Sequence, residues 1–93
     1  MIYNYVNIVA GAPTTTVIKT VQGVLGAIVI NKAAANAIIA IYDGISADGT
    51  LIGTITMPET LLKSQDVLVY NVAFSTGLTI VTTTAQDITV TYE

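Results

Sequence analysis

Hydrophobic and polar side chains alternate one by one along much of this chain. The clearest segment is 88–92 (ITVTY), where apolar residues alternate with two threonines, and 50–57 and 66–74 repeat the pattern. A period of two is typical of a β-strand with one buried face, and β-branched side chains suit the pleated surface. Residues 24–30 and 37–42 are apolar on both faces, which predicts central strands that are covered on both sides.

Gly, Pro, Asn and Asp interrupt these runs at short intervals and separate them into strands. The pattern predicts strands at 2–9, 14–22, 24–31, 37–43, 50–57, 66–74, 77–83 and 87–92. One stretch, 58–63, suggests a helical turn. Strands this short and this numerous predict an all-β fold: a single-domain, eight-stranded antiparallel β-sandwich, jelly-roll-like. The side chains expected in its core are Ile28, Ile30, Ile39, Ile41, Ile55, Tyr70, Val72, Ile80, Ile88 and Val90.

The length of 93 residues fits one domain, 1–93, because a second domain would be too small to bury its own core. Only 10% of the residues are charged, against about 25% in average soluble domains. Two explanations are open. The chain is an apolar, threonine-rich β domain, or part of its surface is buried against other subunits.

The composition excludes several classes of function. Without His or Cys the chain has no zinc finger, haem ligand, disulfide or His-assisted nucleophile. Three lysines, no arginine and a net charge of −3 argue against nucleic-acid binding. No apolar run reaches the roughly 18 residues of a membrane-spanning helix, and residues 1–5 carry no charged signal region. We therefore expect no membrane partner and synthesis in a cytosol.

Four features invite a chemical interpretation, and each has a simpler one. The loop 43–49 has oxygen-bearing side chains but lacks the spacing of a calcium-binding loop, so Asp43 and its neighbours are expected to form a turn. The threonine pairs lack the regular repeat of ice-binding proteins. Tyr3 and Tyr5 share one side of the first strand, as packing residues or as a sugar platform. The six acids lie at turns and ends, so we expect no enzyme, cofactor or metal.

The segment 42–55 (YDGISADGTLIGTI) carries a family resemblance. It is similar to a loop, YD-x-x-SA-x-GT-x-I, that joins two strands in small β-sandwich virion proteins of tailed bacteriophages. As in those proteins, a strand like 21–30 precedes it, and segments like 71–82 and 87–92 follow it. The resemblance implies a virion component that decorates or cements the capsid, or belongs to a head fibre or tail. It implies no catalytic residue, and the strand at 2–10 is additional to the pattern.

This additional strand suggests a contact between chains. Residues 1–10 carry no charged side chain and mix Tyr, Ile, Val and Asn, which suits pairing with a sheet edge. We expect residues 2–9 to contact another chain. The interface candidates are Ile2, Tyr3, Tyr5, Val6 and Ile8.

The sequence therefore supports two hypotheses from different classes. The first is a phage structural protein that is made in the host bacterial cytoplasm and resides in the virion. It would bridge capsid subunits, with the major capsid protein or another virion protein and its own copies as partners, as a dimer or trimer. The alternative is a tail or head-fibre module that binds host surface glycans through exposed Tyr and loop Asn and Asp.

Overall fold

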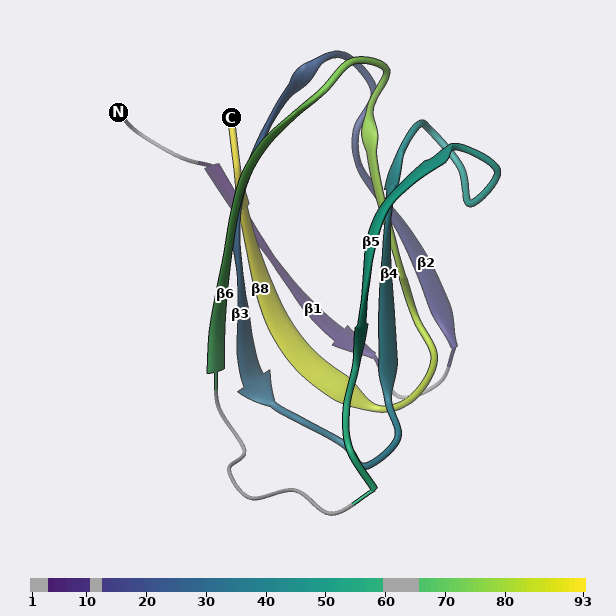
Figure 1. Cartoon of the computed structure of the whole chain (residues 1–93), viewed down its shortest axis with the longest axis vertical. Coiled ribbons are helices and arrows are strands. Elements are labelled where there is room, and N and C mark those ends of the chain that lie inside the picture. The colour runs from purple at the N-terminus through teal and green to yellow at the C-terminus, as the bar shows by residue number, and fades with distance from the viewer. Residues whose placement is uncertain (1–3, 11–12, 60–65) are drawn as a thin grey trace.

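The computed structural model of the chain describes residues 4–10, 13–59 and 66–93, and these form eight strands without a helix (Figure 1). Residues 60–63 of the suggested helical turn at 58–63 lie outside the described residues. The strands are β1 (Asn4–Ala10), β2 (Thr14–Lys19), β3 (Gly23–Lys32), β4 (Ile38–Asp43), β5 (Thr50–Thr56), β6 (Asp66–Phe74), β7 (Leu78–Thr82) and β8 (Gln86–Tyr92). They confirm the predicted strands, and the largest difference is that β2 ends at Lys19 rather than at residue 22.

The strands form two four-stranded sheets, which Figure 1 shows as separate layers. The first sheet has the order β1-β8-β3-β6, and the second has the order β2-β7-β4-β5. Every neighbouring pair is antiparallel. The pairs are nested, because β4 pairs with β5, β3 with β6, β2 with β7 and β1 with β8. The chain thus doubles back at the β4–β5 loop, and each strand of its first half meets its counterpart from the second half.

Both sheets contribute to one hydrophobic core, because every second side chain of their strands points inward. A row across the first sheet shows this: Val6, Val90 and Ile28 are in register and are half-buried, buried and buried. The buried cluster comprises Ile8, Leu25, Ile28, Ile30, Ile39, Ile41, Phe74, Leu78, Ile80, Ile88 and Val90. Seven of the ten expected core residues belong to it, and Ile55 and Tyr70 are half-buried against it.

The expectation for Val72 is wrong, because this side chain is 36% exposed. In the pairing of β3 with β6, Leu25 is opposite Val72 and Ala27 is opposite Val69, so β6 contains one extra residue. Asn71 accommodates it with a φ of 51°, a left-handed conformation that asparagine tolerates better than most residues. β6 is also an edge strand. Val72 therefore lies beside an irregularity, with a neighbouring strand on one side alone, and cannot be fully covered.

Candidate functional site: the outer face of the first sheet

The side chains that point away from the core on the first sheet form one surface, which we call the outer face. The pairing places them in rows across all four strands; one row runs from Tyr5 through Thr91 and Ala27 to Val69. The next row begins at Asn7. The outer face comprises Tyr5, Asn7, Val9, Ala27, Val29, Asn31, Val67, Val69, Asp87, Thr89 and Thr91.

The outer face carries large apolar side chains that the fold leaves uncovered. Tyr5 is 75% exposed, Val9 70%, Val67 57% and Val69 68%. These are four of the nine large hydrophobic side chains that are exposed among the described residues. Two lie on β1 and two on β6, so they flank the sheet at its two edges. Several exposed apolar side chains on one face of a sheet mark an interaction site more often than single scattered ones do.

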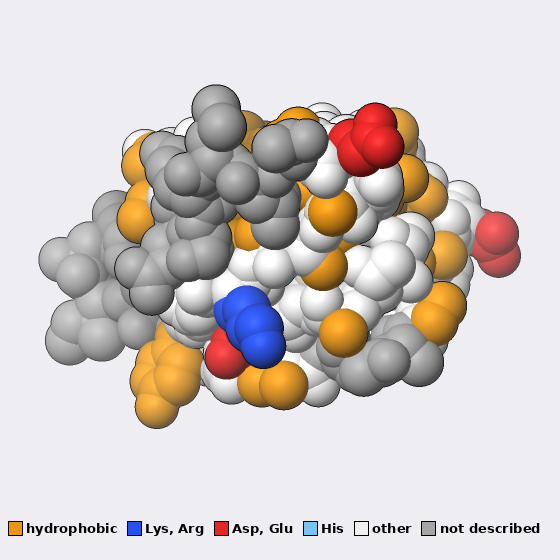
Figure 2. All heavy atoms as spheres, turned by 90° about the horizontal axis from the view of Figure 1, so that it is seen from below, with side chains coloured by type: hydrophobic (Ala, Val, Ile, Leu, Met, Phe, Trp, Pro, Cys, Tyr) orange, Lys and Arg blue, Asp and Glu red, His pale blue; other side chains and the backbone are white. Residues whose placement is uncertain are grey.

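Charged groups are sparse on the surface as a whole. Figure 2 views the molecule from one end of the sandwich, where acidic and basic side chains are few among uncharged and hydrophobic atoms and the basic one lies directly beside an acidic one. Only 10% of the residues are charged. Sparse charge fits both explanations that the sequence leaves open, an apolar, threonine-rich β domain or a surface that is partly buried against other chains.

A network of polar side chains crosses the centre of the outer face, joining β1, β8 and β3. We call it the Asn–Asp–Asn ladder. Asn7 Nδ2 donates to Asp87 Oδ1 at 2.7 Å, to the Ile88 carbonyl at 2.9 Å and to Thr89 Oγ1 at 3.3 Å. From the other side, Asn31 Nδ2 donates to Asp87 Oδ1 at 3.2 Å and to Thr89 Oγ1 at 2.9 Å. The network therefore holds both asparagine side chains in fixed orientations on the surface.

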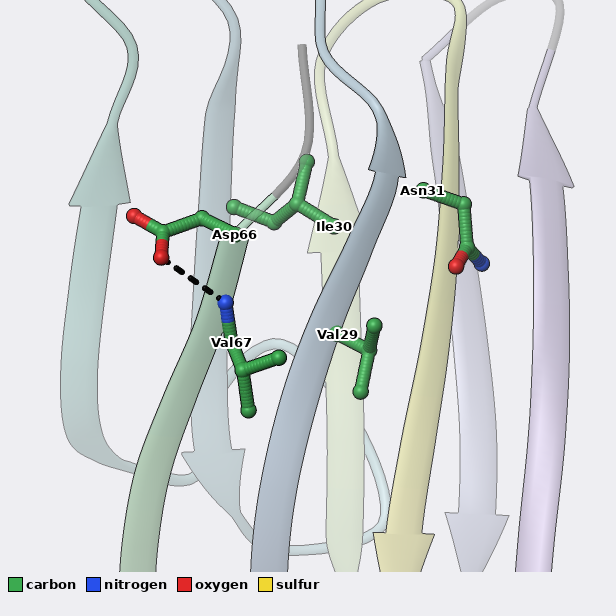
Figure 3. A pocket seen from close by; sticks show the side chains of 5 residues that line it. All are labelled: Val29, Ile30, Asn31, Asp66 and Val67. Carbon is green, nitrogen blue, oxygen red and sulfur yellow. Dashed lines mark hydrogen bonds between the residues drawn. The ribbon is translucent and has the colours of Figure 1, made fainter. Parts of the chain in front are cut away.

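A shallow hollow opens at the β3–β6 side of the outer face (Figure 3). It is lined by Val29, Ile30, Asn31, Asp66 and Val67. The carboxylate of Asp66 accepts a hydrogen bond from the Val67 backbone N–H at 2.9 Å. Two valines form an apolar wall, while Asn31 and Asp66 supply polar atoms. None of the five lining side chains is aromatic, so the hollow lacks the ring on which a sugar stacks.

The structure places the interface candidates in three different environments. Ile2 and Tyr3 lie outside the described residues. Tyr5 is exposed on the outer face, whereas Val6 is half-buried against the core. Ile8 is only 6% exposed and belongs to the core of its own chain. In this arrangement Ile8 has almost no surface left for a partner, and Tyr5 is the candidate that a second chain reaches most readily.

The strand that carries these candidates is paired within its own chain. β1 pairs with β8 along its whole length, from Asn4 opposite Tyr92 to Ala10 opposite Gln86. It is nevertheless an edge strand of the first sheet. Its second side therefore presents backbone groups to which a strand from another chain can bind.

The loop that invited a calcium interpretation has a structural role, as the simpler interpretation predicts. The carboxylate of Asp43, at the end of β4, faces the turn between β6 and β7. It accepts hydrogen bonds from Ser75 N at 2.9 Å, Ser75 Oγ at 3.1 Å, Thr76 N at 2.9 Å and Gly77 N at 3.4 Å. No group of three or more acidic, His or Cys side chains that could hold a metal occurs among the described residues. Asp43 instead ties two loops together.

This arrangement predicts an acid-sensitive contribution to stability. The hydrogen bonds from the backbone N–H groups of Ser75, Thr76 and Gly77 lower the pKa of Asp43 below its ordinary value of 3.8, and outweigh partial desolvation. Because the folded state favours the ionised form, Asp43 stabilises the fold above pH 3.8. That contribution is lost as the pH falls through the lower folded-state pKa.

The test compares melting temperatures of the wild type and Asp43→Asn between neutral pH and pH ~2. We expect the variant to melt lower at neutral pH and the difference to shrink in acid. Asp48→Asn, in the same loop, is the matched control and should follow the wild type. A deficit of Asp43→Asn that stays constant over the whole range contradicts the assignment.

The chain was compared with family models, with curated proteins and with solved structures. No family model, curated protein or solved structure matches the chain. Among the described residues, no helix has the length and apolar character that crossing a membrane requires.

Proposed function

We propose that this chain is a structural protein of a bacteriophage virion that decorates or cements the capsid by bridging shell subunits. The outer face of the first sheet is the observation that carries the proposal. Its exposed tyrosine and valines would be costly to leave in water, and they flank a preformed polar network. Burying this face across a joint between shell subunits adds binding free energy that stabilises the assembled shell.

The nested strand pairing supports a finer description of the fold. We propose that the sandwich is a jelly roll. Its support is the order β1-β8-β3-β6 and β2-β7-β4-β5, which results when a long antiparallel hairpin is rolled into two sheets. Jelly rolls are a recurrent architecture of viral capsid proteins and of lectins. The fold alone therefore suits both a capsid protein and a glycan-binding module. The choice between them depends on the side chains at the surface.

Copies of the chain join, in this proposal, along the free edge of β1 to give a dimer or trimer. Tyr5 projects from that edge strand and is 75% exposed, so it lies where a neighbouring copy would pack. Lysine on an edge strand opposes pairing with another strand, because its charge would have to be desolvated. Tyr5→Lys should therefore disrupt assembly without removing any core side chain.

The measurement is the solution mass by light scattering across a concentration series. We expect the wild type to keep the mass of a dimer or trimer, and Tyr5→Lys to shift toward the monomer. The control is Leu51→Lys on β5 of the other sheet, where an apolar side chain that is 52% exposed receives the same charge. This control should retain the wild-type mass. A wild-type monomer at every concentration contradicts the proposal, as does an equal effect of both lysines.

The second candidate function is recognition of host glycans by a tail or head-fibre module. Two observations favour it: the hollow of Figure 3 has the amide of Asn31 beside apolar side chains, and Tyr5, on β1 at the other edge of the sheet, exposes its ring. Binding to a glycan array that is lost in Tyr5→Ala would support this function over the structural one. The absence of an aromatic side chain among the five that line the hollow is why we place it second.

A further inference from the structure

The Asn–Asp–Asn ladder contains acceptor oxygens that make no hydrogen bond within the described part of the chain. An amide that donates to a carboxylate must present its nitrogen to it, so the bonds to Asp87 fix the orientation of Asn7 and Asn31. Both amide nitrogens are engaged, and Asp87 Oδ1 accepts from both. Within the described part of the chain, neither the two amide oxygens nor Asp87 Oδ2 receives a hydrogen bond. The ladder thus offers three acceptor oxygens, one of them on a carboxylate.

We propose that the ladder binds an arginine side chain of a shell protein. A guanidinium group is planar, always charged and carries five N–H donors, so it can engage a carboxylate oxygen and neighbouring amide oxygens together. The apolar side chains beside the ladder assist, because Val29 and Val67 lie in the same row as Asn7 and Val9 lies opposite Asp87. Contact with a partner there removes water from the ion pair and strengthens it. This inference rests on the proposed function, because the arginine would belong to a shell protein that the chain contacts.

Charge complementarity identifies the occupant as a different protein. The chain contains three lysines and no arginine, so a second copy has no guanidinium group to offer. The cation nearest in register is Lys32, whose Cα pairs with that of Asp87. Lys32 is exposed, and no ion pair joins it to Asp87 in the described structure. A lysine ammonium is also a poorer match for acceptors spread over three strands, because it is a compact point charge.

The test uses two small probes on the isotope-labelled, full-length chain. N-acetyl-arginine methylamide is titrated against the chain, and the side-chain NH₂ signals of Asn7 and Asn31 are followed by NMR. The citrulline derivative is the matched probe, since it has nearly the same shape but is neutral. We expect saturable shifts with the arginine probe and at least tenfold weaker binding of the citrulline probe. Equal shifts with both probes overturn the proposal.

Two variants of the chain complete the experiment. Asp87→Asn keeps a carbonyl oxygen for the two asparagines but removes the charge, and it should weaken binding of the arginine probe at least tenfold. Asp48→Asn removes an exposed carboxylate from a distant loop and should bind as the wild type does. Unchanged affinity in Asp87→Asn overturns the proposal. If Asp87→Asn fails to fold, the comparison of the arginine and citrulline probes on the wild type still tests whether the ladder binds a guanidinium group.

The two proposals fail in distinguishable ways. A chain that occupies virions but does not discriminate arginine from citrulline retains the proposed function and loses this inference. A chain that binds the arginine probe through Asp87 but is absent from virions retains the site, while its partner must then be sought outside the capsid.

Discussion

Replacing Ile88 with alanine is expected to lower the free energy of unfolding by about 2–5 kcal/mol. Ile88 is fully buried at the middle of β8. It is opposite Ile8 of β1 and Ile30 of β3, so its side chain packs where three strands meet. Alanine removes apolar contacts and leaves a cavity that neighbours paired on both sides cannot easily fill. For a small domain whose total stability is about 5–15 kcal/mol, this loss is large.

Chemical denaturation of the purified variant measures the effect. Val9→Ala is the matched control, because it removes apolar atoms from the same sheet at a side chain that is 70% exposed. Its change should stay within about 0.5 kcal/mol. Similar losses at both positions contradict the placement of Ile88 at the centre of the core.

The second large effect is expected at Gly77, in the turn that Asp43 holds. A Cβ there would come within 2.6 Å of the Lys19 carbonyl oxygen and 2.9 Å of the Gly44 carbonyl oxygen. Both are backbone atoms, so the chain itself must move to admit a methyl group. We expect Gly77→Ala to cost about 1–3 kcal/mol, as overpacking does elsewhere. The loss should appear as an earlier denaturation midpoint.

Gly53 provides the contrasting variant. A Cβ at Gly53 would meet the Tyr70 hydroxyl at 3.1 Å, and Tyr70 is a half-buried side chain that can rotate away. Gly53→Ala should therefore cost clearly less than Gly77→Ala under the same conditions. The reverse order would mean that the β4–β5 loop and the β6–β7 turn do not approach each other as closely as this structure places them.

The strands were predictable because alternating or continuous apolar runs, and the turn residues that interrupt them, are local features of the sequence. Residues 66–74, for example, form β6 at the predicted bounds. The irregularity at Asn71 was not predictable, because it depends on which strand β6 pairs with. The same holds for Gln86, which lies just before the strand predicted at 87–92. It begins β8 as a side chain only 3% exposed, and neither polar atom of its amide has a hydrogen-bond partner among the described residues.

The Asn–Asp–Asn ladder could not be predicted from the sequence, for a different reason. Asn7 and Asn31 lie 80 and 56 residues from Asp87, and only the sheet order β1-β8-β3 brings them together. Nothing about an isolated asparagine in a strand indicates such a partner. A strand was predicted at 2–9, with Tyr3 and Tyr5 on one side of it. This prediction did not indicate which face the protein's own core would cover, and so Ile8 was grouped with Tyr5 as an interface candidate.

The central claim is that this chain is a structural component of a virion. The most direct measurement is quantitative mass spectrometry of particles of the encoding phage after gradient purification. We expect a fixed ratio of this chain to the major capsid protein, and that ratio should persist through repeated gradients. A chain that is absent from the particles and stays with the soluble proteins of the lysate contradicts the claim.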